Sequence, residues 1–128
     1  MWTQLHFGTQ LSADVPSDVI EVLKYMVGGC GDEPPLPVHP LFSKSRWKRM
    51  LRCDSYYFHY KTTSLLRFDD IAQQWYFNIT CNLKNYGEIE AFVDWIMPYC
   101  GESAGAFLGY SRYVEAEIPT MIFMGDTA

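Results

Sequence analysis

Apolar and polar residues alternate strictly between Trp75 and Leu83. Because successive side chains of a β-strand point to opposite faces of a sheet, this alternation predicts a strand with one buried face. The buried face would carry Trp75, Phe77, Ile79, Cys81 and Leu83. The opposite face would carry Tyr76, Asn78, Thr80 and Asn82. The same alternation predicts a second strand near the N-terminus, with inward positions at Leu5, Phe7, Thr9 and Leu11.

A helical pattern follows each of these strands. The first predicted helix has Pro16 in its first turn and ends at Gly28-Gly29, with an apolar stripe of Val19, Val22, Leu23, Met26 and Val27. The second has Asn85 as its N-cap and Glu88 three residues later, which is capping-box spacing, and Pro98 ends it. Its apolar stripe consists of Ile89, Phe92, Val93 and Ile96.

The two halves of the chain repeat one order of elements. Further strands are predicted in pairs, at Ser55–Tyr60 and Ser64–Phe68 in the first half and at Ala106–Val114 and Ile118–Met124 in the second. We interpret the chain as one domain with pseudo-repeats at about residues 1–70 and 71–128, each a β-α-β-β unit. The predicted fold is α+β and two-layered, a mainly antiparallel sheet with two helices on one face. Phe7 and Ile79 would then occupy equivalent buried positions.

An insertion at residues 28–43 distinguishes the first half. Between Gly28 and Pro40 it reads GGCGDEPPLPVHP, and this density of glycine and proline excludes regular structure. Long irregular loops on a rigid scaffold often carry function. One hypothesis is therefore a small-ligand binder or an enzyme whose pocket lies between the sheet and the 28–43 loop.

Composition supports a globular protein without a membrane span. The chain has 128 residues, 48% of them hydrophobic and 16% aromatic, and no apolar run approaches the roughly 18 residues that a span requires. The first residues lack the basic and apolar regions of a signal peptide, and the four cysteines are irregularly spaced. We expect a cytoplasmic protein with reduced thiols.

Charge is unevenly distributed along the chain. The formal net charge is −5, yet five of the ten basic residues lie within residues 44–52, and from Glu88 onward seven acidic residues stand against Arg112 alone. The basic stretch and the aromatic-rich centre supply the candidate interaction residues Arg46, Trp47, Lys48, Arg49, Arg52 and Tyr76. Cations beside an exposed indole would suit phosphates and bases, which makes a nucleic-acid binder one hypothesis.

We favour a different interpretation of the basic stretch. Trp47, Met50 and Leu51 would anchor a short amphipathic helix from about Ser43 to Leu51, with its cations solvated or paired with the acidic body. A net acidic domain also repels a polyanion. Nucleic acid therefore ranks below a protein partner.

No motif indicates catalysis, a metal or a cofactor. The glycines around Cys30 lack the features of a phosphate-binding loop, and Asp32 and Glu33 beside Cys30 disfavour its thiolate. The three histidines, His6, His39 and His59, show no metal-ligand spacing. We predict no catalytic residue, no metal site and no cofactor.

Part of the C-terminal half resembles a known group of proteins. The residues that carry the resemblance are Asn82–Glu90, Trp95–Tyr99, Phe107–Tyr113 and Ile118–Ile122. They are similar to small uncharacterised accessory proteins of actinobacterial phages, over about the last third of the chain. The resemblance implies an accessory protein in the cytoplasm of a bacterial host, and it assigns no residue a role.

The sequence favours a non-enzymatic protein-interaction factor, a phage accessory protein acting on a host or defence protein. This hypothesis depends on the absence of a catalytic constellation, on the uneven charge and on the surplus of aromatic residues, which dominate protein interfaces. A homo-oligomer would use the same apolar surface. The ligand binder or enzyme and the nucleic-acid binder remain the alternatives.

Overall fold

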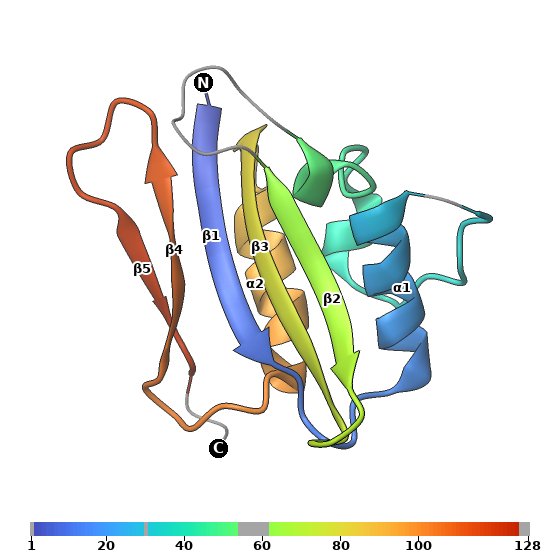
Figure 1. The fold of residues 1–128 in the computed structure, drawn as a ribbon. Coiled ribbons are helices and arrows are strands. Elements are labelled where there is room, and N and C mark those ends of the chain that lie inside the picture. The colour runs from blue at the N-terminus through green and yellow to red at the C-terminus, as the bar shows by residue number, and fades with distance from the viewer. Residues whose placement is uncertain (1, 30, 54–61, 126–128) are drawn as a thin grey trace.

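A computed structural model describes residues 2–29, 31–53 and 62–125 of the chain. In chain order the elements are β1 (Trp2–Gln10), α1 (Ser17–Gly28), the 3₁₀ helices η1 (Pro40–Ser43) and η2 (Met50–Arg52), β2 (Thr63–Asp69), β3 (Gln74–Lys84), α2 (Glu88–Ile96), the 3₁₀ helix η3 (Met97–Tyr99), β4 (Phe107–Tyr113) and β5 (Thr120–Phe123). These strands form one antiparallel sheet, and the predicted α+β class is confirmed (Figure 1). The predicted strand 55–60 lies outside the described residues.

The sheet has the order β2-β3-β1-β4-β5, with β1 and β3 as its central pair (Figure 1). The connection through α1 leads from β1 to β2, and the connection through α2 leads from β3 to β4. Each connection therefore crosses a strand of the other half, which is the split β-α-β arrangement. In this topology β2 is the counterpart of β4, and β5 extends one edge.

Phe7 and Ile79 lie directly opposite each other in the β1–β3 pair, and both are buried. If the two halves are equivalent, an approximate two-fold axis passes through this pair. The duplication stays a prediction, because the segment 55–60, for which the sequence predicts a strand of the first half, lies outside the described residues.

One aromatic cluster joins α2 to the central strands. The ring centroid of Phe92 in α2 lies 6.1 Å from that of Phe7 in β1 and 6.0 Å from that of Phe77 in β3. All three side chains are fully buried, as the alternation and the helical spacing predict. Aromatic side chains bury more area than aliphatic ones, so this cluster is the centre of the core.

The helix ends differ slightly from the prediction. Gly29 ends α1 in the left-handed conformation and donates its N–H to the carbonyl oxygen of Tyr25, as expected for a glycine C-cap. Gly87, with φ of 98°, precedes α2 where Asn85 was expected. Asn85 Oδ1 still accepts the N–H groups of Gly87 and Ile89, and the Glu88 carboxylate accepts the N–H of Tyr86. Asn85 therefore still caps the helix, although the N-cap position itself lies two residues later, at Gly87.

The predicted helix at 43–51 is wrong, because turns and η2 occupy this segment. Like charges at helical spacing, such as Lys44 with Lys48 and Lys48 with Arg52, disfavour an α-helix here. The anchoring side chains, however, are buried as predicted: Trp47, Met50 and Leu51.

Candidate functional site

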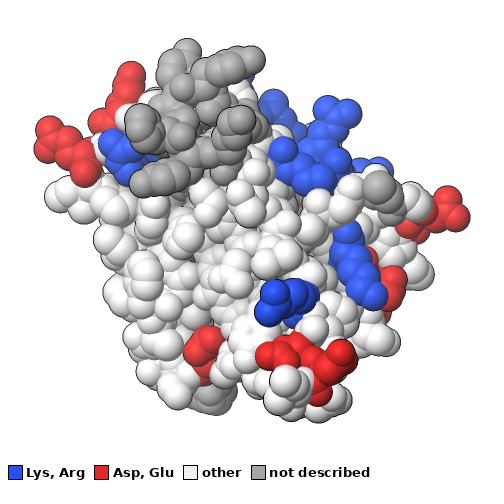
Figure 2. Space-filling view, viewed as in Figure 1, with Lys and Arg blue, Asp and Glu red and all other residues white. Residues whose placement is uncertain are grey.

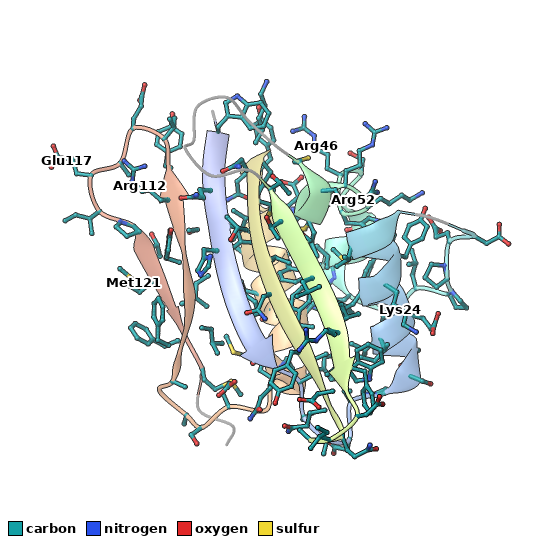
Figure 3. All side chains as sticks on the ribbon, in the orientation of Figure 1. Lys24, Arg46, Arg52, Arg112, Glu117 and Met121 are labelled. Carbon is teal, nitrogen blue, oxygen red and sulfur yellow. The ribbon has the colours of Figure 1, made fainter. Side chains whose placement is uncertain are left out.

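The cations of the basic stretch fall into two groups in the structure. Figure 2 shows Lys and Arg side chains gathered over this segment, at the upper right, and Figure 3 labels Arg46 and Arg52 there. Lys48 and Arg52 are bound to other parts of the chain, whereas Arg46 and Arg49 line a pocket. Trp47 does not present an exposed indole, because it is 3% exposed and packs edge-on against Phe42 at a centroid distance of 5.0 Å.

Lys48 and Arg52 attach the basic stretch to α1 and its following loop. Lys48 Nζ lies 2.6 Å from Glu33 Oε1, and this hydrogen bond raises the pKa of Lys48. Arg52 Nε donates to the carbonyl oxygen of Met26 at 3.1 Å, in the last turn of α1. A cation at a helix C-terminus is favourable, because carbonyl groups there lack helical partners. Arg52 therefore has a structural role.

Replacing Arg52 by alanine should lower the free energy of unfolding by about 1–2 kcal/mol, because a helix-end carbonyl loses a charged donor. The measurement is urea denaturation followed by circular dichroism. Arg49→Ala is the matched control, since Arg49 is exposed in the same segment, and its change should stay within about 0.5 kcal/mol. Equal losses in the two variants would contradict the capping role.

Arg46 and Arg49 line a hollow of about 350 Å³, which we call the basic pocket. Its lining residues are Trp2, Arg46, Arg49, Met50, Cys53, Leu83 and Lys84. Trp2 and Lys84 are register partners in the β1–β3 pair, and Lys84 Nζ lies 5.5 Å from the centre of the Trp2 ring. The sequence pattern did not single out these two residues, because only the pairing of β1 with β3 brings them to the basic stretch.

Tyr76 lies apart from the basic pocket. It is half-buried on the face of β3 opposite the helices, with Gln10 and Arg67 as register partners. Lys84 lies eight positions further along β3, which corresponds to about 26 Å. The structure therefore does not bring Tyr76 together with the other candidate interaction residues.

The described thiols are poor nucleophiles. Burial raises the pKa of Cys53, and the nearby guanidinium groups of Arg49, Arg52 and Arg46 only partly oppose this effect. Burial also raises the pKa of Cys81, and it raises that of Cys100 to about 11. The three thiols are therefore protonated at neutral pH, which is their unreactive form. Cys30 and His59 lie outside the described residues.

Each of the described histidines contacts a residue that is distant in the sequence. His6 Nδ1 lies 2.8 Å from Thr80 Oγ1 on the sheet face opposite the helices. His39 Nε2 lies 2.9 Å from Asp94 Oδ2 and joins the insertion to α2. Residues 2–29, 31–53 and 62–125 contain no group of three metal-ligating side chains, and no helix among them is long and apolar enough to cross a membrane.

The Pro-rich insertion packs beside α1. A hollow of about 470 Å³ there is lined by Ser17, Asp18, Glu21, Asp32, Glu33, Pro34 and Pro35. These residues belong to α1 and the loop, whereas the sequence hypothesis placed a pocket between the loop and the sheet. Four of these seven lining residues are acidic, and the seven include no histidine, cysteine, lysine or arginine.

A larger hollow lies beneath the β4–β5 hairpin, and we call it the hairpin groove. It has a volume of about 810 Å³ and separates the hairpin from α2. Its apolar lining includes Ile89, Val93, Met97, Tyr113, Ala116, Ile118 and Ile122, and its two charged lining residues are Glu90 and Asp94. In Figure 1, α2 lies behind the central strands, and no described helix stands behind β4 and β5.

The hairpin also exposes apolar side chains outside the groove. Phe107, Met121 and Phe123 are each about half exposed, at 55%, 46% and 53%. The rings of Phe107 and Phe123 contact each other across the strands, with centroids 5.8 Å apart. Figure 3 labels Met121 on β5 and Glu117 in the β4–β5 turn. The hairpin therefore combines an apolar surface with an acidic turn.

The resemblance of residues 82–122 to phage accessory proteins stays a prediction. The basic pocket and the hairpin are the two described surfaces that bear on function. Comparisons with protein-family models, with curated proteins and with solved structures find no significant match to this chain.

Proposed function

We propose that the protein is a non-enzymatic interaction factor that binds a partner protein through the β4–β5 hairpin. The observation that carries this proposal is the character of β5: it is an edge strand without a charged residue, and apolar side chains are exposed around it. Exposed apolar surface of this kind is typical of protein contact sites.

The edge of β5 offers main-chain groups to a partner. Natural sheets protect exposed edges with lysine, proline or bulges within the strand, because unpaired N–H and C=O groups attract other strands. The sequence of β5 is Thr-Met-Ile-Phe, and Pro119 lies before the strand rather than within it. An extended segment of a partner would add to this edge as a further strand.

The residues that line the hairpin groove indicate which side chains a partner segment should carry. The groove has a mainly apolar lining, to which Glu90 and Asp94 add carboxylates, and Glu115 and Glu117 lie in the adjoining turn. Asp94 also contacts His39. Its described lining contains no lysine or arginine. Charge complementarity therefore favours a partner segment with apolar side chains flanked by Lys or Arg. The resemblance to phage proteins adds a context, in which this partner is a host or defence protein.

Ile118→Glu should weaken capture of the partner from a bacterial lysate by about tenfold or more, because it places a charge in the apolar lining of the groove. Met121→Glu tests the edge strand in the same way. The matched control is Ile71→Glu, since Ile71 is 97% exposed in the turn between β2 and β3, and Ile118 is 79% exposed in the turn of the hairpin. The readout is quantitative mass spectrometry of the proteins that co-elute with each tagged variant.

Thermal melting of the variants gives the folding control, since neither isoleucine is part of the core. Equal recovery of the same proteins with wild type and with both hairpin variants would contradict the proposal. Loss with Ile71→Glu as well would indicate non-specific capture. Light scattering on the purified protein shows whether a second copy is the partner: a dimer that Met121→Glu dissociates would assign the hairpin to self-association.

A further inference from the structure

We infer that the basic pocket binds a small phosphorylated molecule. The phosphate would lie among the side chains of Arg46, Arg49 and Lys84, and the apolar part of the molecule would pack against Trp2. This inference concerns a second site, built from β1, the end of β3 and the basic stretch. It does not depend on the binding of a partner at the hairpin.

The cations of the basic pocket have no carboxylate partner among the described residues. The ion pairs found there are Lys24–Glu21, His39–Asp94 and Lys48–Glu33, and none of them involves a residue that lines the pocket. The nearby buried carboxylate of Glu88 accepts the N–H of Tyr86 at 2.7 Å and is not part of the lining. Three cationic residues thus line one hollow, which is an arrangement that attracts an anion.

Aromatic rings hold two of these cations in position. The guanidinium carbon of Arg46 lies 4.8 Å from the centre of the Tyr86 ring, and Lys84 Nζ lies 5.5 Å from that of Trp2. Such contacts restrict long side chains before a ligand binds, which reduces the entropy lost on binding. Arginine is also suited to phosphate, because its planar fork donates two parallel hydrogen bonds to two oxygens.

The lining of the basic pocket indicates a ligand that has an apolar part as well as a negative charge. Trp2, Met50 and Leu83 supply apolar surface beside the cations, and the protonated thiol of Cys53 adds no negative charge. The volume of about 350 Å³ lies in the range of small-molecule sites. A phosphate attached to one aromatic ring matches this combination of charge and apolar surface.

A small molecule fits these observations better than a nucleic-acid strand. A strand requires several phosphate contacts in succession along a groove. In the basic stretch, Glu33 neutralises Lys48, and Arg52 is bound to the last turn of α1. Of the cations that remain, Arg46 and Arg49 line the basic pocket together with Lys84, whereas Lys44 is not part of its lining and lies beside Gly87.

The test is isothermal titration calorimetry of the full chain with phenyl phosphate, inorganic phosphate and phenol at about 0.15 M salt. Phenyl phosphate should bind with a Kd of about 1 mM or below, and at least about tenfold more tightly than either of the other two compounds. That order shows that both the phosphate and the ring are recognised.

Arg49→Glu should weaken phenyl phosphate binding by about tenfold or more, since a charged donor is replaced by a repelling carboxylate. Arg67→Glu is the matched control, because Arg67 is an exposed arginine on β2 and the net charge changes equally. It should leave the Kd within about twofold. Thermal melting verifies that both variants are folded.

Three results would overturn the inference. The first is the absence of phenyl phosphate binding at concentrations up to about 10 mM, which is well above the expected Kd. The second is an equal loss of binding in Arg49→Glu and Arg67→Glu, which would show a general effect of net charge. The third is tight, salt-sensitive binding of a single-stranded RNA that Arg49→Glu abolishes while phenyl phosphate fails to compete, which would assign the cations to nucleic acid.

Discussion

Replacing Phe92 by alanine is expected to lower the free energy of unfolding by about 3–5 kcal/mol. The side chain is fully buried, and its ring contacts those of Phe7, Phe77 and Trp95. Alanine would leave a cavity where α2 meets the central strands, and these rings are too constrained to fill it. Urea denaturation followed by tryptophan fluorescence measures the change.

Phe123→Ala is the matched control for this prediction. The same atoms are removed, but Phe123 is 53% exposed at the edge of the sheet and its described ring contact is with Phe107. Its loss should be about 1 kcal/mol or less. A loss below about 1 kcal/mol for Phe92→Ala itself would mean that the centre of the core lies elsewhere.

Gly109→Ala should destabilise the protein by about 3 kcal/mol or more, through the backbone rather than the core. A Cβ atom at this position would lie 1.9 Å from the carbonyl oxygen of His6 and 2.8 Å from Cα of Phe7. Both atoms belong to the backbone of β1, which cannot rotate away as a side chain can. The strands β1 and β4 would have to separate at the Phe7–Gly109 pair.

Chemical denaturation measures this change as well, and Gly125→Ala is its control. A Cβ atom on Gly125 would have no neighbour within 4 Å, so its effect should stay within about 0.5 kcal/mol. Similar small losses for both glycine variants would show that β4 lies farther from β1 than the structure indicates.

Local periodicity was sufficient to predict most elements of the fold. The alternation around Phe77 and the helical spacing around Phe92 each report which side chains face the core, and both residues are buried as predicted. The same reasoning failed for the basic stretch, where it predicted an α-helix. Trp47, Met50 and Leu51 have helical spacing, but short 3₁₀ turns bury them equally well, and repulsion between neighbouring cations opposes an α-helix.

The two candidate sites could not be predicted, because each depends on contacts between distant parts of the chain. The basic pocket requires Trp2 to pair with Lys84, and the hairpin groove requires Ile89 of α2 to face Ile122 of β5. Neither contact can be predicted from the spacing of residues within one element. The role of Gly109 could not be predicted from the sequence either. The sequence contains nine glycines, and only the strand register shows that Gly109 lies against the backbone of His6.

The crossed connections of the sheet also determine when the native contacts of β1 can form during synthesis on the ribosome. The central strand β1 is synthesised first, but its partners β3 and β4 follow much later, with Trp2 opposite Lys84 and Thr3 opposite Tyr113. The apolar side chains of β1 therefore lack their native neighbours until β3 and β4 have been made. Pairings over such long separations are slow to form, so the sheet should become stable only after β4 has left the ribosome.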